Sequence, residues 1–178
     1  EGGKSTSCLN TAQVLAHQGK KVCGLDADPN NRLVNWKASA ETTREVIGEI
    51  NEQNLSKTIN GLGSYDYVFI DLEGKASLLT SRAILKSDFV VIPMQASLPD
   101  AAQANRIINL IHDDQAIIGK EIKHSFLMTR TSPLIKTIIE SKIVNQINGI
   151  DYPMFNNQLK ERIAFKAIFF NKCTIYDL

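Results

Sequence analysis

The chain has 178 residues, 43% of them hydrophobic and 22% charged, with a formal net charge of +1, which by itself predicts no nucleic-acid binding. These values are typical of an ordinary soluble globular protein with one core. No apolar run approaches the ~20 residues of a membrane-spanning helix, and no signal-peptide pattern is present. The three cysteines form no close-spaced pair and so indicate buried or free thiols in a reducing cytoplasm, not a disulfide framework.

The charges are unevenly distributed along the chain. Residues 1–114 carry 11 Lys+Arg against 14 Asp+Glu, a net −3, whereas residues 115–178 carry 9 against 5, a net +4. An acidic front half and a basic back half indicate an anionic partner for the back half. Scattered surface lysines explain the same count, and both interpretations stay open.

Helical periodicity and short apolar runs alternate along the chain. In order, we expect a helix over 5–17, a strand over 22–25, a helix over 32–40, a short strand over 46–50, a helix over 55–62, a strand over 67–70, a helix over 77–86, a strand over 89–93, a helix over 100–114, a strand over 125–129, a helix over 135–147, an edge strand over 153–155 and a last helix over 160–170. This alternation predicts an α/β fold, a doubly wound, mostly parallel sheet with helices on both faces. With no linker or repeat visible, we expect a single domain over residues 1–178.

The first residues have the pattern of a phosphate-binding loop. Gly2-Gly3-Lys4-Ser5-Thr6 is the second half of a P-loop, in which glycines let the backbone approach a polyphosphate and the next helix points its positive end at the anion. Lys4 would contact the β- and γ-phosphates and the Ser5 hydroxyl would face Mg²⁺. The full pattern needs a glycine five positions before Gly3, which would lie before Glu1, so we expect the chain to begin inside the motif. A glycine turn before a capped helix is the alternative.

Polar residues end three of the predicted strands, and ligands bind at the carboxyl ends of strands in open α/β sheets. Asp71 follows an apolar strand downstream of the P-loop, as does the Walker-B aspartate that holds Mg²⁺ or its water shell. Asp26 and Asp28 could divide the work, one toward the metal shell and the other toward an attacking water. Thr129 and Arg130 end a third strand. Each aspartate, taken singly, could instead cap a helix or end a strand.

Together these motifs resemble the ParA partition ATPases, members of the ParA/MinD group with a deviant Walker A box. The resemblance runs through nearly the whole chain and is greatest to small plasmid-type members. It is carried by the segments at 3–6, 25–30, 65–71, 91–95, 129–132 and 174–178. It implies a cytoplasmic, nucleoid-associated P-loop ATPase that binds ATP and Mg²⁺, forms a homodimer on ATP binding and binds non-specific DNA. It further implies slow ATP hydrolysis, stimulated by a centromere-binding, ParB-like adaptor.

The resemblance also implies residue roles. Thr6 would lie on the α-phosphate side, Thr129 and Arg130 would contact the adenine, and Asp28 would orient the hydrolytic water. The residues implied to bind the nucleotide are Gly2, Gly3, Lys4, Ser5, Thr6, Thr129 and Arg130, those implied at the metal are Ser5, Asp26 and Asp71, and those implied in hydrolysis are Lys4 and Asp28.

Three departures separate this chain from the family pattern. The family's signature lysine, which reaches the partner's phosphates across the dimer, has no counterpart in residues 1–178, and we expect the family's first strand to be missing with it. Asn30 stands where the family commonly has Gln, and Leu72-Glu73-Gly74 replaces the more usual Thr-Pro-Pro or Thr-Pro-Gly. These changes bear on the details of the nucleotide switch.

Basic residues near the last two predicted helices are candidates for DNA contact. A dimer would double each phosphate contact, and the absence of interleaved aromatic residues limits the expectation to sequence-independent binding of the backbone. A solvated helix face is the alternative for each residue. The candidates are Lys136, Lys142, Lys160, Arg162 and Lys166.

Other functions would use the same ATPase core. A MinD-like membrane-recruited scaffold needs a C-terminal amphipathic helix, and residues 163–170 are apolar enough to raise that alternative. They resemble the family's closing core helix, however, so we expect no stable membrane association. A ParA-like accessory ATPase of conjugative DNA transfer cannot be separated from a partition ATPase by sequence. A small-molecule ligase or an iron–sulfur reductase is disfavoured, because neither a substrate pocket nor a cluster-binding cysteine pair is found.

Overall fold

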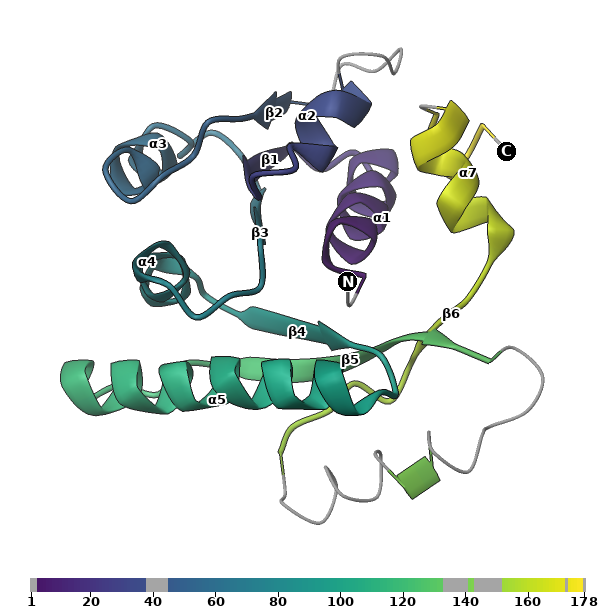
Figure 1. The fold of residues 1–178 in the computed structure, drawn as a ribbon. Helices are drawn as coiled ribbons and strands as arrows, with labels where there is room; N and C mark the ends of the chain where they lie inside the picture. The colour runs from purple at the N-terminus through teal and green to yellow at the C-terminus, as the bar shows by residue number, and fades with distance from the viewer. Residues whose placement is uncertain (1–2, 38–44, 133–140, 143–151, 172, 178) are drawn as a thin grey trace. The chain divides into compact units, whose positions relative to one another are not determined.

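The computed structural model describes residues 3–37, 45–132, 141–142, 152–171 and 173–177 (Figure 1). The chain forms two compact units. We call residues 5–73 with 162–178 the β1–β3 unit, and residues 1–4 with 74–161 the β4–β6 unit. Each unit contains a three-stranded parallel sheet.

The β1–β3 unit has the strand order β2-β1-β3. Every residue of the central strand β1 is buried, as expected for a parallel strand covered on both faces. Helix α1 lies on one side of this sheet and α3 on the other (Figure 1). The elements are α1 (Lys4–His17, whose first residue belongs to the other unit), β1 (Val22–Ala27), α2 (Arg32–Lys37), β2 (Glu45–Ile47), α3 (Leu55–Asn60), β3 (Tyr67–Leu72) and α7 (Ile163–Asn171).

Helices α1, α2 and α7 share one hydrophobic core. Its buried side chains are Leu9, Leu33, Trp36 and Ile168. Trp36 is 2% exposed, and its indole Nε1 donates a hydrogen bond to the Cys173 carbonyl oxygen at 3.0 Å. The indole therefore contributes apolar area to the core and also binds the backbone that follows α7.

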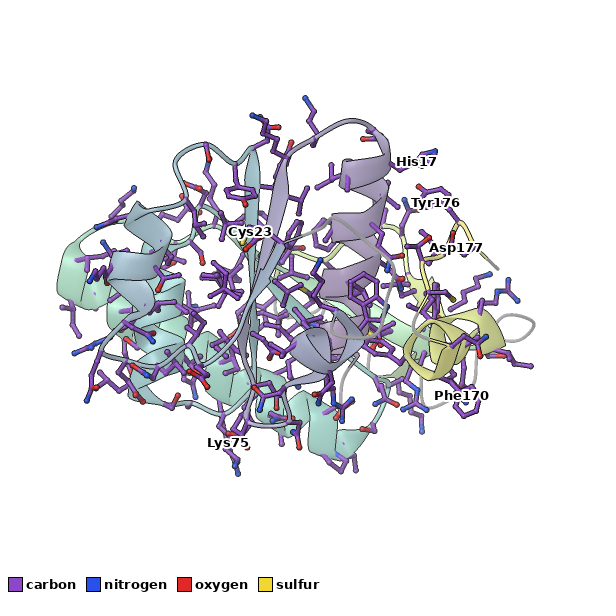
Figure 2. The ribbon with its side chains drawn as sticks, turned by 90° about the horizontal axis from the view of Figure 1, so that it is seen from above. His17, Cys23, Lys75, Phe170, Tyr176 and Asp177 are labelled. Atoms are coloured by element: carbon purple, nitrogen blue, oxygen red, sulfur yellow. The ribbon has the colours of Figure 1, made fainter. Side chains whose placement is uncertain are left out.

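The C-terminal residues contact α1 as well. The backbone N–H of Ile175 donates to Gln13 Oε1 at 2.8 Å, so an α1 side chain that is fully buried binds the C-terminal backbone. The rings of His17 and Tyr176 stack with centroids 3.9 Å apart and an interplanar angle of 14° (Figure 2). The residues that follow α7 thus pack against α1, the helix that follows the glycine turn.

The β4–β6 unit has the strand order β4-β5-β6, and Val90 to Met94 pair in register with His124 to Met128. The core of this unit lies between the sheet and helices α4 and α5, and comprises Ile84, Ile92, Met94, Ala104, Ile108, Ile111, Ile122, Phe126 and Met128. The elements are α4 (Leu78–Lys86), β4 (Val90–Met94), α5 (Leu98–Ile118), β5 (His124–Thr131) and β6 (Leu159–Lys160).

Side-chain caps determine where α4 and α5 begin. Ser77 accepts a hydrogen bond from Thr80 N at 3.2 Å, and Ser97 accepts one from Asp100 N at 3.3 Å. Helix α5 ends at Gly119, whose φ of +64° is left-handed and favours glycine. The caps at Ser97 and Gly119 explain why α5 extends beyond the predicted 100–114 at both ends.

The predicted α/β fold class is confirmed. All named strand pairs are parallel, and strands alternate with helices along most of the chain. The prediction of a last helix over 160–170 is wrong at its start. Lys160 pairs with Thr131 in strand β6, and α7 begins only at Ile163. The helical periodicity that follows does not extend back across residues that pair with β5.

Three further predicted elements are described only in part. Of the edge strand predicted over 153–155, Met154 forms an isolated parallel bridge with Phe126. The helix predicted over 135–147 lies outside the described residues except for 141–142, which are helical, and the end of the helix predicted over 32–40 also lies outside them. Within the described ranges, no helix combines the length and apolarity needed to cross a membrane. The single-domain organisation stays a prediction.

Candidate nucleotide site

Gly3 forms a left-handed turn directly before helix α1. Gly3 has φ +75°, and a Cβ built on it would lie 3.3 Å from the side chain of Thr129. A side chain at this position would be strained and crowded, so the turn needs glycine. Directly after it, α1 begins at Lys4, with Ser5 buried and Thr6 half-buried. Gly2 lies outside the described residues.

Thr129 and Arg130 occupy different environments at the end of β5. Thr129 is 2% exposed, packs beneath Gly3 and donates its hydroxyl to the Met94 carbonyl oxygen at 3.2 Å. Arg130 has φ +52° at a register shift between β5 and β6. Its guanidinium pairs with Glu161 at 3.3 Å, both side chains being nearly half exposed. Arg130 thus reaches outward from the strand end, whereas Thr129 supports the glycine turn.

Lys4 lies against the backbone of Gly74. Gly74 has φ +80°, and a Cβ built on it would lie 2.7 Å from Lys4 Nζ and 2.8 Å from Lys4 Cε. The Gly74 carbonyl oxygen accepts a hydrogen bond of 2.7 Å from Gln103 Nε2 of α5. The phosphate lysine of the predicted P-loop therefore rests where a side chain at position 74 would be.

Two of the predicted metal-shell carboxylates are neighbours across the sheet of the β1–β3 unit. The parallel register of β1 and β3 places Asp26 opposite Asp71. Paired residues on adjacent parallel strands present their side chains to the same face. Asp26 and Asp71 are 1% and 2% exposed, so two carboxylates are buried side by side at the carboxyl end of this sheet.

Asp26 also holds the start of helix α2. Its Oδ2 accepts hydrogen bonds from the backbone N–H groups of Leu33 at 2.8 Å and Val34 at 3.0 Å, and Oδ1 accepts one from Asp28 N at 3.3 Å. Burial raises the pKa of this carboxyl, and the three backbone N–H groups act in the opposite direction. The capping role considered for the aspartates therefore applies to Asp26, alongside its position next to Asp71.

Asp28 is oriented by Asn30. The backbone N–H and the side-chain Nδ2 of Asn30 both donate to Asp28 Oδ1, at 2.8 and 2.7 Å. Asp28 itself is 8% exposed. Asn30, which stands where the ParA family commonly has Gln, therefore binds one oxygen of the carboxylate that is predicted to orient the hydrolytic water.

Cys8 lies close to the aspartate pair. Burial raises the pKa of its thiol well above the usual value, and the negative charges of Asp71 and then Asp26 raise it further. Cys8 lies three residues after Ser5, so the two occupy neighbouring positions on one face of α1. The start of α1 therefore faces the strand ends that carry the two carboxylates.

These residues fit a magnesium ion that a nucleotide brings with it. Among the described residues, no group of three or more His, Cys, Asp or Glu side chains could hold a metal ion. Mg²⁺ commonly needs only one or two carboxylates, because phosphates and waters complete its octahedral shell. The adjacent carboxylates of Asp26 and Asp71 meet that smaller requirement.

Comparison with known proteins identifies the family of the chain. The family model described as VirC1 protein matches residues 1–172. The chain belongs to the VirC1 family. It is 34% identical to Protein ParA of Rhizobium radiobacter over 94% of this chain and 77% of the relative. It is 29% identical to Protein virC1 of Rhizobium rhizogenes over 93% of this chain and 74% of that relative.

A solved structure shows the same fold. The septum site-determining protein MinD of Pyrococcus horikoshii OT3, in complex with Mg-ADP, superposes with a TM-score of 0.71 at 15% sequence identity. The match covers 99% of this chain and 83% of that protein. The resemblance inferred from the motifs is therefore confirmed at the level of family and fold.

The predicted DNA-contact residues of this VirC1-family chain are on separate elements. Lys160 lies in β6, Arg162 immediately precedes α7 and Lys166 lies within it, and all three are exposed. Lys142 is exposed in a helical segment, and Lys136 lies outside the described residues. The four described side chains are accessible, and their role in DNA binding stays a prediction.

Sequence reasoning missed several contacts of the site. Cys8 was predicted only to be a buried or free thiol, although its spacing from Ser5 on a helix was a usable signal. Gly74 was recognised as part of a departure from the family pattern, but its contact with Lys4 was not predicted. Gln103, 29 residues after Gly74, carried no motif signal, and neither did Glu161.

Proposed function

We propose that this VirC1-family protein is an ATP-dependent DNA partition ATPase. In this proposal it binds ATP with Mg²⁺, dimerises, binds non-specific DNA and is reset by slow, adaptor-stimulated hydrolysis. The observation that carries the proposal is the in-register burial of Asp26 beside Asp71. Two carboxylates at neighbouring strand ends offer the oxygen ligands that a nucleotide-bound Mg²⁺ takes.

Each residue has a role that follows from its chemistry. Lys4 binds the β- and γ-phosphates as a point charge, and the backbone at Gly3 approaches them closely. Ser5, with Asp26 and Asp71, holds Mg²⁺ or its water shell, and the ion supplies charge neutralisation at the phosphates. Asp28 orients the hydrolytic water, and the two Asn30 hydrogen bonds fix its carboxylate.

The relatives support the choice of reaction. One relative bears the name ParA, and the MinD structure contains Mg-ADP. For the DNA step, exposed Lys160, Arg162 and Lys166 supply cations to phosphates. Cytoplasmic location, nucleoid association and a ParB-like adaptor belong to the same proposal.

Binding of ATP and ADP, each with and without Mg²⁺, tests the nucleotide step. Titration calorimetry should show Mg²⁺-dependent binding, weakened at least about tenfold by Lys4→Ala, the loss expected from removing one charge-assisted contact. Lys120→Ala removes an exposed lysine that follows α5 and serves as the matched control. Equal affinity of Lys4→Ala and the wild type would contradict the proposed phosphate role.

The conjugative alternative differs from partition in its partner. A ParA-like accessory ATPase of DNA transfer would use the same ATP-dependent switch but assemble with DNA-processing proteins of conjugation. Affinity purification from cells, in the ATP-bound state, separates the two. Recovery of a small centromere-binding protein supports partition, whereas recovery of conjugation proteins supports the alternative.

The MinD-like alternative is tested on helix α7. Ile163 and Phe170 are 85% and 87% exposed, which is the observation that bears on lipid binding. We still expect no stable membrane association. Sedimentation with anionic phospholipid vesicles should leave the ATP-bound protein in the supernatant, and co-sedimentation abolished by Phe170→Ser would favour the membrane-recruited scaffold.

A further inference from the structure

Helix α5 is bonded to the segment that follows the Walker-B aspartate. Gln103 Nε2 donates to the Gly74 carbonyl oxygen at 2.7 Å, a short hydrogen bond between residues 29 positions apart. Gln103 is half-buried, so this bond is partly shielded from water. The bond therefore holds the Gly74 peptide, which follows the predicted metal-shell residue Asp71 by three positions in the sequence.

The bonded glycine also determines where Lys4 lies. The left-handed φ of Gly74 presents its Cα to Lys4, with the Cβ position only 2.7 Å from Nζ and 3.3 Å from Cδ. The lysine stem and ammonium therefore occupy the space that the missing side chain leaves. If the Gly74 peptide rotated, the surface against which Lys4 packs would change.

Gln103 is itself held in place near the start of α5. Ser97 caps the helix, and Asp100 Oδ2 accepts a hydrogen bond of 2.9 Å from Gln95 N, directly after β4. Gln103 follows Asp100 by three residues and lies on the same face of the helix. Its amide thus extends from a helix start that is fixed to the end of a core strand.

The next peptide of the loop is fixed independently. The Lys75 carbonyl oxygen accepts a hydrogen bond of 2.6 Å from Thr80 Oγ1 of α4. Two consecutive carbonyl groups are therefore bound by side chains of two helices. Loss of the Gln103 bond would release only the peptide that contacts Lys4, while Thr80 keeps the rest of the loop attached to α4.

We propose that Gln103 is a positioning residue for Lys4, acting through the Gly74 peptide that it holds against the lysine stem. This inference rests on the proposed role of Lys4 in phosphate binding and adds a residue outside the P-loop to it. Because the ammonium contacts the β- and γ-phosphates in that role, a displaced Lys4 lowers the affinity for ATP more than the protein's stability.

Two variants of Gln103 test the inference. Gln103→Met keeps the length and removes the donor without adding charge, and Gln103→Glu keeps the shape with a group that cannot donate when ionised. We expect each to weaken Mg-ATP binding about tenfold, as for one misplaced charge-assisted contact. The melting temperature should fall by no more than about 4 °C, the shift of a single ordinary hydrogen bond. Asn109→Asp, at an exposed amide on the same helix, is the matched control.

Combination with Lys4→Arg gives the decisive readout. If Gln103 acts through Lys4, Gln103→Met should cost much less ATP affinity in the Lys4→Arg background than alone, because the two changes affect one contact. Additive losses, or wild-type affinity in both Gln103 variants, would overturn the inference while leaving the proposed function intact. A wild type that binds no ATP would overturn both.

Discussion

The Cα of Gly74 lies so close to Lys4 that a Cβ there would be 2.7 Å from the ammonium nitrogen. Gly74→Ala should therefore displace Lys4 in addition to straining a left-handed backbone. Strain alone costs about 1 kcal/mol of unfolding free energy, and displacement should also weaken Mg-ATP binding. Calorimetry and chemical denaturation measure the two effects separately.

Gly119→Ala isolates the strain. Gly119 has φ +64° and nothing within 4 Å of its Cβ position, so alanine there should lower stability without changing ATP affinity. Equal ATP affinities for both alanine variants would show that the contact between Gly74 and Lys4 has no functional consequence.

The two hydrogen bonds from Asn30 to Asp28 Oδ1 predict a hydrolysis defect. Asn30→Ala removes the side-chain donor and leaves the backbone one, so the carboxylate loses part of its orientation. We expect the hydrolysis rate of the bound nucleotide to fall about tenfold with unchanged ATP affinity, the pattern of a contact used only in the transition state. Single-turnover phosphate release measures the rate.

Asn60→Ala, at an exposed amide at the end of α3, is the control for this experiment and should hydrolyse ATP at the wild-type rate. If Asn30→Ala also retains that rate, the orienting role of Asn30 is excluded.

Cys23 should be protected from alkylation in the folded protein. It is fully buried in β1, and burial, followed by the charge of Glu45, raises the pKa of its thiol to about 11. At pH 8 its thiolate fraction is then about 100-fold below that of an ordinary cysteine, so iodoacetamide should modify it only on unfolding. Peptide mass spectrometry identifies the site, and rapid modification of Cys23 in the native protein would contradict the buried position.

The same raised pKa predicts a pH dependence of stability. Because the folded value of about 11 lies above the ordinary 9.0, the thiol's contribution is fully present below pH 9 and is lost as the pH rises through 11. Between these values, Cys23→Ala should lose less unfolding free energy than the wild type, as measured by urea denaturation. Parallel curves for the two proteins would show that Cys23 does not titrate in this range.

The hydrogen bond from Trp36 Nε1 to the Cys173 carbonyl oxygen predicts that replacement of this tryptophan destabilises the protein. Trp36→Phe removes the donor and leaves the partly buried Cys173 carbonyl oxygen without it, which should cost about 0.5–1.5 kcal/mol. Far-ultraviolet circular dichroism in urea measures the change. In the wild type, fluorescence of this sole tryptophan should report unfolding at the same midpoint. A loss below about 0.3 kcal/mol would contradict a bond that matters for stability.

Local pattern was sufficient to predict the elements that carry most of the site. The strands that end near Asp26 and Asp71 are short apolar runs followed by acidic residues, a signal that does not depend on distant contacts. The start of α1 was predictable for a similar reason, because glycine and Lys4-Ser5 mark both a turn and a helix N-terminus. The family resemblance implied a place at the metal for both Asp26 and Asp71, which agrees with the shared carboxyl edge of parallel strands.

Contacts between distant residues were not predictable in this way. The hydrogen bond from Gln103 to Gly74 depends on how α5 lies beside a loop, and no local pattern encodes that placement. Strand β6 was missed because residues 159–160 form a strand only by pairing with β5. The hydrogen bonds by which Asp26 caps α2 depend on the path of the chain between β1 and α2. The sequence therefore did not predict that Asp26 both caps α2 and lies beside Asp71.

Binding of non-specific duplex DNA under three nucleotide conditions tests the central claim most directly. Fluorescence anisotropy with Mg-ATP, with Mg-ADP and without nucleotide should show tight binding only with ATP, weakened as salt rises and lost in Lys4→Ala. Such a result would establish an ATP-dependent switch between DNA-bound and free states. Absence of DNA binding in every state, in a protein that still binds ATP, would contradict the partition function.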